Sequence, residues 1–185
     1  MFTSGGMGKM DMGVVRLRPA GDGDEAFLYD VFCTTWEDEV ASLPNPALAQ
    51  HMLRIQYTAH ERRFHSRYPG FVRYVVMLDD EPIGRLYLLH SERTIHLIDT
   101  TLLREHRRQG LGTHLAERVL DEAAGEGKTV TLRCARRNHR ALALYISLGF
   151  KLQTMDDLDC YLEWRPEEQP EAPTTDGLDP EDSAG

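Results

Sequence analysis

The sequence predicts one α/β domain built around a mixed β-sheet. The chain has 185 residues, a length that suits a single domain. Its composition is that of an ordinary soluble globular protein, 41% hydrophobic and 28% charged. Strand-like and helix-like hydrophobic patterns alternate along residues 14–165 in the order β-α-α-β-β-β-α-β-α-β, which is the order of an α/β domain.

The first predicted elements are a short strand and two helices. Residues 14–18 read as a strand, and the apolar positions of residues 27–32 have helical spacing. A second helix begins at Asn45, which suits an N-cap, and Pro46, which suits the first helical position. The pattern of this helix runs to about Arg67, before a Pro-Gly pair breaks it.

The remaining elements alternate strands and helices. Three strand-like runs at 71–78, 83–89 and 94–103 are separated by turn residues. A helix over about 110–124 carries one apolar face and precedes a strand at 129–134. The last pair is a helix from Asn138, closed by Gly149, followed by a strand at 158–164.

The charge is concentrated at the C-terminal end. Of the net −9, most belongs to residues 166–185, which hold seven acids and no base, so that 23 acids face 21 lysines and arginines elsewhere. Four prolines and few apolar residues predict that this acidic tail is disordered. Residues 1–13 are expected to be a disordered leader. The nearly neutral body, with no aromatics between its basic residues, argues against nucleic acid as a partner.

The sequence carries no signal for a membrane or an oxidising compartment. No apolar run reaches the roughly 18 residues of a membrane span, and the N-terminus lacks the apolar segment of a secretory signal. Three widely spaced cysteines argue against a disulfide framework. We therefore expect a cytoplasmic protein that does not act at a membrane. Cys134, in a strand, is expected to be a packing residue.

Residues 100–115, TTLLREHRRQGLGTHL, form the most informative stretch. A strand runs into a basic turn that opens a helix, and the start of a helix leaves backbone N–H groups unpaired with a partial positive charge. Gly110 and Gly112 would let an anion approach this backbone, while Arg107 and Arg108 add full charges. The pattern predicts a diphosphate cradle.

Two common phosphate-binding motifs do not fit this stretch. A P-loop needs a lysine, and none occurs here. A dinucleotide-binding turn needs a third glycine where the chain has Leu115, and it follows the first strand of its unit.

Two segments resemble the GNAT acyltransferase superfamily. Residues 107–112, RRQGLG, match its pyrophosphate-binding pattern Arg/Gln-x-x-Gly-x-Gly/Ala. Residues 138–150, NHRALALYISLGF, resemble its second signature, with Asn, Ala, Tyr and Gly-Phe at similar spacing. The order of elements also resembles that of the family over about residues 14–164. The chain departs from the usual pattern at Arg104 and Arg108, where proline and glycine are common.

The resemblance implies a fold and an activity. The fold is a mixed, mostly antiparallel twisted sheet flanked by about four helices, with a splayed central strand pair (α+β in some schemes). The activity is transfer of an acetyl group from acetyl-CoA to a primary amine of a small molecule, protein or peptide, by direct attack in a ternary complex. The alternative is a non-catalytic acyl-CoA sensor or partner-binding module on the same fold.

The resemblance also implies roles for individual residues. The backbone of the cradle would hold the CoA diphosphate, the end of the preceding strand would pair with the pantetheine arm, and a backbone N–H near Leu102 would polarise the thioester carbonyl. Asn138 would contact the pantetheine, although helix capping alone also explains it. The implied cofactor-binding residues are Leu102, Leu103, Arg107, Arg108, Gln109, Gly110, Leu111, Gly112, Thr113 and Asn138.

Tyr145 matches the tyrosine that often serves this family as general acid beside the sulfur, although its helical spacing also suits a core residue. Asp99 is the first candidate for the general base, because it precedes the cradle on the same strand face as Leu103. Glu37, Glu39 and His96 are alternatives, and a water chain would need no single base.

The metal, the acceptor and the oligomeric state are less constrained. His60 and His65 lie five residues apart, off one helix face, so we expect no zinc site. Acids at 37–39 suit a cationic amine, whereas arginines of the second helix, such as Arg63, suit an anionic group. The acceptor therefore stays open, and either a monomer or a homodimer is compatible with the sequence.

Overall fold

The computed structural model describes residues 13–41 and 45–166. The expected leader up to residue 12 and the expected tail from residue 167 lie outside the described residues. The strands are β1 (Val15–Pro19), β2 (Val72–Leu78), β3 (Glu81–His90), β4 (Thr94–Leu102), β5 (Thr129–Ala135), β6 (Lys151–Met155) and β7 (Asp159–Trp164). The helices are α1 (Glu25–Cys33), α2 (Glu37–Ala41), α3 (Pro46–Arg67), α4 (Leu111–Gly125) and α5 (His139–Ser147).

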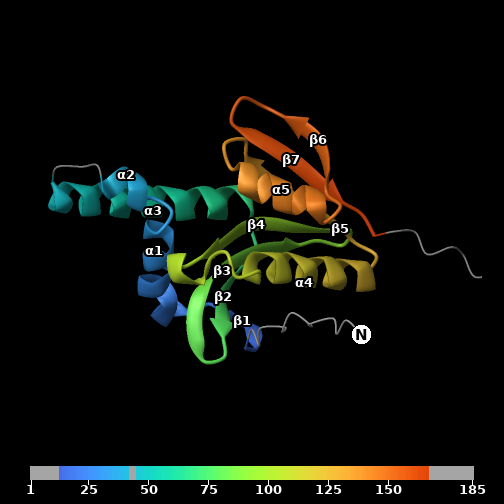
Figure 1. The fold of residues 1–185 in the computed structure, drawn as a ribbon, viewed down its shortest axis with the longest axis horizontal. Coiled ribbons are helices and arrows are strands. Elements are labelled where there is room, and N and C mark those ends of the chain that lie inside the picture. The colour runs from blue at the N-terminus through green and yellow to red at the C-terminus, as the bar shows by residue number, and fades with distance from the viewer. Residues whose placement is uncertain (1–12, 42–44, 167–185) are drawn as a thin grey trace, which may run out of the picture.

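The seven strands form one open sheet in the order β1-β2-β3-β4-β5-β7-β6 (Figure 1). Every neighbouring pair is antiparallel except β4 and β5, which run parallel. The parallel pair is joined through α4, because parallel strands need a long crossover connection. The prediction of a mixed, mostly antiparallel sheet is confirmed.

The central strands β4 and β5 separate partway along their length. They pair only from Thr94–Leu97 to Thr129–Leu132, although β4 continues to Leu102 and β5 to Ala135. A bulge on the other side of β4 coincides with this point, since Tyr87 pairs with Asp99 whereas Leu88 pairs with Leu97. The expected splayed strand pair is thereby confirmed.

Helices cover the two faces of the sheet with separate apolar clusters. The larger cluster lies under α4 and α5 and includes Leu97, Leu102, Leu115 and Tyr145. The smaller one lies under α1 and α3 and contains Leu28, Val75 and Tyr87. We call these the α4/α5 face and the α1/α3 face. Any cleft between the diverging ends of β4 and β5 therefore has one opening on each face.

The two predicted asparagine caps are present. The Asn45 side chain accepts hydrogen bonds from the N–H groups of Ala47 and Leu48, at 3.0 and 3.2 Å, with Pro46 in the first turn. The Asn138 side chain accepts from the Ala141 N–H at 3.1 Å. Both satisfy donors that a helix start leaves open.

The described residues contain one α-helix and one strand that the sequence did not predict. Helix α2 has five residues, too few for a helical pattern to be recognised. Strand β6 lies at the edge of the sheet with every residue exposed, and its register shifts between Leu152 and Thr154. An edge strand of this kind shows no alternation of buried and exposed positions, which is the signal that identifies strands.

Over the described ranges, no helix is both long enough and apolar enough to cross a membrane. Cys134 is buried in the α4/α5 cluster, and burial raises the pKa of its thiol to about 11. The thiol is therefore protonated and the residue packs, as expected.

Candidate active site

The turn between β4 and α4 has the backbone of an anion-binding loop. Arg108 and Gly110 both have left-handed backbones, with φ of 66° and 81°, and Gly110 is the N-cap of α4. The first hydrogen bond of the helix runs from the His114 N–H to the Gly110 carbonyl at 3.0 Å. The N–H groups of residues 111–113 therefore have no partner within the helix and carry its positive end. We call residues 107–113 the cradle.

The left-handed backbone at Arg108 explains why related sequences often have glycine at this position. A non-glycine residue with positive φ is uncommon, whereas glycine adopts this conformation without cost. The turn therefore requires a left-handed backbone at residue 108 but no particular side chain. Gly112 has a different reason to be glycine, since a Cβ built on it meets nothing within 4 Å. Its outer side is open space, which leaves the backbone at the start of α4 accessible.

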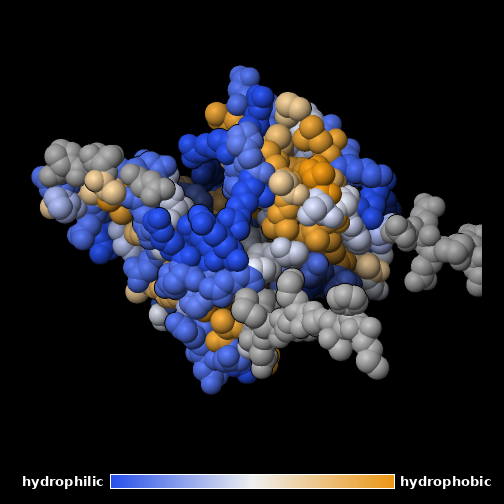
Figure 2. Space-filling model, viewed as in Figure 1, coloured by the Kyte–Doolittle hydropathy of each residue, from blue (hydrophilic) through white to orange (hydrophobic). Residues whose placement is uncertain are grey.

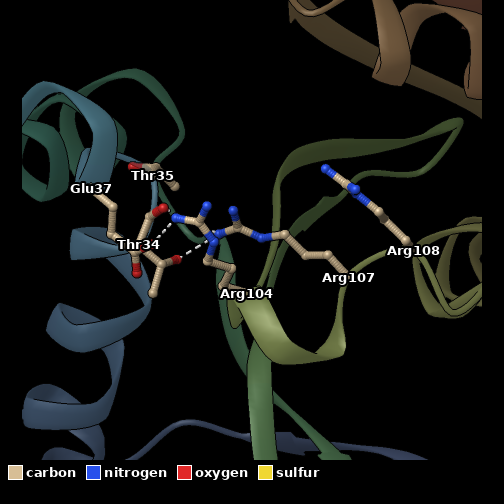
Figure 3. A pocket seen from close by; sticks show the side chains of 6 residues that line it. All are labelled: Thr34, Thr35, Glu37, Arg104, Arg107 and Arg108. Carbon is tan, nitrogen blue, oxygen red and sulfur yellow. Dashed lines mark hydrogen bonds and ion pairs between the residues drawn. The ribbon is translucent and has the colours of Figure 1, made fainter.

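Arg107 ties the cradle to the rest of the molecule. Its Nε donates to the Leu102 carbonyl at 2.8 Å and its Nη2 to Thr34 Oγ1 at 2.6 Å. Beside it, Arg104 donates to Glu37 Oε2 at 2.7 Å. Figure 3 shows both arginines reaching toward the end of α1, while the guanidinium of Arg108 lies apart from them and makes none of the contacts drawn. The charge of Arg107 is therefore used in holding the loop, and Arg108 supplies the exposed guanidinium.

A cleft of about 690 Å³ runs from the cradle along the diverging end of β4. We call it the cofactor cleft. Its walls come from β4, the cradle and α5, and they include Thr100, Leu102, Gly112, Asn138 and Tyr145. Segments distant in sequence thus meet here, so that both sequence signatures line one cavity.

Of the two β4 residues expected to pair with the pantetheine arm, Leu102 and Leu103, only Leu102 turns its backbone groups toward the cleft. The Leu103 N–H donates to the Ile83 carbonyl at 2.9 Å, so it is engaged toward β3 and not toward the cleft. Backbone groups alternate sides along a strand, and the Leu102 N–H and carbonyl therefore face the cleft side. Because the Leu102 carbonyl already accepts from Arg107, the Leu102 N–H is the group that remains to meet a bound molecule.

Tyr145 is a buried phenol at the wall of the cofactor cleft. Its side chain is 9% exposed, and burial raises its pKa to about 12. The residue therefore belongs both to the core and to the cleft, so the two sequence interpretations are compatible. A phenol with this pKa stays protonated at neutral pH and can only donate its proton.

Thr100 is a polar group of the cleft that sequence reasoning missed. Its Oγ1 is buried and makes no hydrogen bond of ordinary geometry to a described residue. It lies near enough to the Tyr145 phenol, however, for its hydroxyl to interact with the phenol oxygen, which opposes the rise in the pKa of Tyr145. Thr100 and Tyr145 therefore form a small polar pair in the wall of the cleft. No sequence pattern indicated this role, because Thr100 and Thr101 look alike in a strand.

Asp99 lies on the α1/α3 face and is held in a buried ion pair. Its Oδ2 accepts from Arg85 Nη2 at 2.5 Å, and its Oδ1 accepts from the Thr101 hydroxyl at 2.7 Å. Arg85 is 1% exposed. Burial opposes the charge of Arg85, but Asp99, Tyr87 and Glu61 outweigh it and raise the pKa of the guanidinium. Both Asp99 oxygens are thus engaged.

The alternative bases have different surroundings. Glu37 pairs with Arg104 on the cradle side, as described above. His96 Nδ1 lies 2.8 Å from Thr131 Oγ1, and its Nε2 is buried without a hydrogen bond to any described residue. Burial, and then the charge of Arg67, lower the pKa of His96, so this imidazole is neutral at pH 7. It does not line the cofactor cleft.

His60 and His65, the two histidines considered as zinc ligands, make other contacts. The His60 ring packs 4.2 Å from the Phe64 ring, centre to centre, and His65 Nδ1 lies 2.9 Å from the Glu61 carbonyl. In the part of the chain that the structure describes, no group of three or more His, Cys, Asp or Glu side chains is arranged to hold a metal ion.

Comparison with protein families identifies the chain. Residues 27–150 match the model described as "Acetyltransferase (GNAT) family". The matched segment contains most of the chain, including the cradle and Tyr145, and the chain therefore belongs to the GNAT acetyltransferase family. A search of curated proteins found no match.

Several solved structures share the fold of this chain. The PaiA N-acetyltransferase of Thermoplasma acidophilum, in complex with coenzyme A, has a TM-score of 0.61 at 18% identity and covers 82% of this chain and 99% of its own. The Campylobacter jejuni N-acetyltransferase PseH, in complex with acetyl coenzyme A, has a TM-score of 0.54 at 14% identity, covering 83% and 100%. Spermidine N-acetyltransferase SpeG of Vibrio cholerae, with CoA and spermine, has a TM-score of 0.55 at 18% identity, covering 82% and 95%.

Proposed function

We propose that this protein transfers an acetyl group from acetyl-CoA to a primary amine, by direct attack in a ternary complex. One observation carries the proposal. The diverging ends of β4 and β5 open a cleft that begins at an anion-binding cradle and reaches a buried, protonated phenol. The proposal gains support from membership of the GNAT family and from the structural neighbours that contain CoA or acetyl-CoA.

The cradle would hold the diphosphate of acetyl-CoA. Backbone N–H groups of residues 108–113 supply the donors, and Arg108 supplies a full positive charge. Gly112 leaves the space that the phosphate oxygens need. In this arrangement Arg107, Gln109 and Leu111 shape the loop: Arg107 bonds Leu102 and Thr34, Gln109 Nε2 donates to the Glu105 carbonyl at 2.7 Å, and Leu111 is buried.

The pantetheine arm would lie along β4 toward Tyr145. We assign the Leu102 N–H to the thioester carbonyl, because it faces the cleft, where a donor would stabilise the negative charge that develops on the oxygen. Asn138 would contact the arm while capping α5, and Leu103 would contribute its side chain alone. The buried Thr100 hydroxyl, next to the phenol, would meet polar atoms of the substrates.

The transfer step breaks the C–S bond and forms a C–N bond. The neutral amine nitrogen attacks the acetyl carbonyl carbon, and the electron pair of the C–S bond leaves with the sulfur. Tyr145 would donate its proton to that sulfur and recover one from solvent. The proton lost by the amine would go to water, because both oxygens of Asp99 are held by Arg85 and Thr101. This gives Asp99 a positioning role in place of the expected role as base.

The direct test is release of the CoA thiol when the protein, acetyl-CoA and a panel of amines are combined. The panel contains amino acids, amino sugars, polyamines, aminoglycosides and peptides with free N-termini. We expect thiol release that depends on at least one amine, with an equivalent amount of acetylated product by mass spectrometry. Tight acetyl-CoA binding without turnover on any amine would instead support the acyl-CoA sensor.

A further inference from the structure

A second cavity opens on the α1/α3 face where β4 and β5 diverge. It has a volume of about 880 Å³ and lies between the end of α3, the β5–α5 turn and the β6–β7 turn. Ile98, the extra residue of the β4 bulge, lines it, and the next residues of β4, Thr100–Leu102, line the cofactor cleft. The two cavities therefore approach the same gap between the strands from opposite faces of the sheet.

The side chains of this second cavity are mostly cationic. Five arginines line it, against two aspartates, and we call it the arginine cavity. The arginines are Arg63, Arg67, Arg133, Arg136 and Arg137. Figure 2 shows hydrophilic residues gathered between α3 and α5, beside a hydrophobic surface over α5.

Only part of this positive charge is neutralised within the protein. Arg133 pairs with Asp159, and Arg136 donates to the Asp156 carbonyl at 3.2 Å. Among the described residues, Arg63 and Arg137 make no hydrogen bond or ion pair. They come from different elements, the end of α3 and the β5–α5 turn, and they line the same cavity. Two unpaired guanidinium groups facing one cavity form a site for an anion.

The acids that suggested a cationic acceptor lie elsewhere. Glu37 pairs with Arg104 on the cradle side, at 2.7 Å. Glu37 lines the cavity beside the cradle. Neither Glu37 nor Glu39 lines the arginine cavity. The conflict between the two sequence cues is therefore resolved in favour of an anionic group.

We infer that the acceptor is a small primary amine that carries a carboxylate or a phosphate, and that Arg63 and Arg137 bind this anionic group. The inference rests on the proposed acetyl transfer. With its anion in the arginine cavity, the acceptor would present its amine to the gap beside Ile98. The same positive potential lowers the pKa of a nearby ammonium group and so favours the neutral amine that attacks. It also disfavours a polyamine, which brings additional positive charge.

Binding is tested first, because it does not need turnover. Calorimetry measures 4-aminobutyrate, O-phosphoethanolamine and butylamine against the protein, with and without CoA. We expect the two anionic amines to bind at least 10-fold more tightly than butylamine, and the tighter of the two identifies the preferred anion. The double variant Arg63→Gln/Arg137→Gln should lose this preference. Arg62→Gln, the same change on the adjacent residue, which lies outside the arginine cavity, should keep it.

Turnover is the second readout. The ratio of kcat/KM between 4-aminobutyrate and butylamine, and between O-phosphoethanolamine and ethanolamine, should exceed 10 in the wild type and fall toward 1 in the double variant. Equal binding of charged and uncharged amines, or an unchanged preference in the double variant, overturns the inference. So does weaker acetyl-CoA binding in the double variant, which would assign these arginines to CoA. Failure of acetyl-CoA itself to bind would instead overturn the proposed function.

Discussion

The burial of Tyr145 determines what its hydroxyl can do. With a pKa of about 12, the phenol remains protonated through the range in which enzymes work. It is a weaker acid than free tyrosine, so the general-acid role that we propose for it would depend on its lying beside the leaving sulfur. Thr100 is the polar side chain that affects its ionisation from within the cleft.

Tyr145→Phe should lower kcat by about 10²–10⁴, the range for loss of a general acid, and change the acetyl-CoA Kd by less than about 3-fold. Because the pKa of Tyr145 lies near 12, the wild-type rate should show no alkaline limb from this group below pH 10. Steady-state kinetics and calorimetry measure the two quantities, with Tyr74→Phe on β2 as control. Weaker acetyl-CoA binding with normal kcat would make Tyr145 a packing residue.

Asp99→Asn should mainly destabilise the protein, since it leaves the buried Arg85 without its closest partner. Losing one member of a buried pair costs about 3–5 kcal/mol, and we expect the lower end because Glu61 remains 4.0 Å away. Urea unfolding measures the loss. The control Thr101→Val removes a hydrogen bond to Asp99 but no charge, and should cost about 1 kcal/mol.

The pH–rate profile of the same variant separates the two roles of Asp99. If Asp99 positions Arg85, the acidic limb of the profile is unchanged in Asp99→Asn. Loss of that limb with normal stability would restore Asp99 as the general base.

At the residue scale, the sequence predicted the site residues that belong to recognisable motifs. It did not predict residues whose role depends on contacts made only in the folded structure. Tyr145, Gly112 and Asn138 belong to recognisable signatures, and the structure brings them to one cleft. Arg85 lies inside an apolar run that predicts only a strand. Its burial and its pairing with Asp99 depend on the register of β3 against β4, which the bulge at Ile98 sets, and no local pattern reports a register.

At the scale of elements, Gly84 allows β3 and β4 to approach each other closely. A Cβ built on Gly84 would lie 2.4 Å from the Thr101 carbonyl oxygen and 2.8 Å from Leu102 Cδ2. Real Cβ atoms do not come this near to backbone oxygen. Gly84 therefore lets the end of β4, which lines the cofactor cleft, lie against β3.

Gly84→Ala should push Thr101 and Leu102 away from β3. We expect a loss of about 1–3 kcal/mol in the free energy of unfolding, as for other overpacked sites, together with weaker acetyl-CoA binding. Gly125→Ala, near the end of α4 where a Cβ meets nothing within 4 Å, is the matched control and should be neutral or slightly stabilising. Wild-type stability in Gly84→Ala would show that β4 adapts freely.

A second element-scale prediction concerns the start of α1. Asp24 accepts two hydrogen bonds from Arg18, at 2.9 and 2.7 Å, and one from the Gly21 N–H at 2.7 Å. The Arg18 side chain and then the Gly21 N–H lower the pKa of Asp24 from 3.8 to about 2. The stabilisation is therefore present above pH 4 and is lost as the pH falls toward 2.

Asp24→Asn should cost about 0.5–1 kcal/mol at pH 6, since Arg18 is half exposed and solvent screens the pair. The difference from the wild type should shrink at pH 3. Urea unfolding at the two pH values measures it. An equal difference at both would mean that the charge of Asp24 is not the source.

Elements with strong periodicity or caps were predicted, and those defined by pairing were not. Asn45 with Pro46 located the start of α3, and the apolar face of α4 located that helix. Strand β6 exists because β7 provides an edge to pair with, which is a tertiary cause. The separation of β4 from β5 was expected only through the family resemblance, since neither strand shows it in its own sequence.

At the scale of the molecule, positive charge is divided between two cavities that approach the β4–β5 gap from opposite faces of the sheet. The cradle presents backbone N–H groups and Arg108 on one side of the β4–β5 gap, and the arginine cavity presents Arg63 and Arg137 on the other. In our proposals, the CoA diphosphate and the acceptor anion would therefore bind at separate sites. The body of the chain is nearly neutral, so these charges act locally rather than through a general positive field.

The central claim is that acetyl-CoA binds at the cradle, and calorimetry of the wild type and Gly112→Val tests it most directly. Gly112 is preferable to Gly110, whose positive φ would strain any substitute. Since a Cβ at Gly112 meets no protein atom within 4 Å, the valine variant should fold normally, as thermal unfolding will show, while its side chain occupies the place of the anion.

We predict a Kd below about 1 mM for acetyl-CoA in the wild type and a loss of at least 30-fold in Gly112→Val. Absence of binding to the wild type, or equal binding to a folded Gly112→Val, would contradict the account.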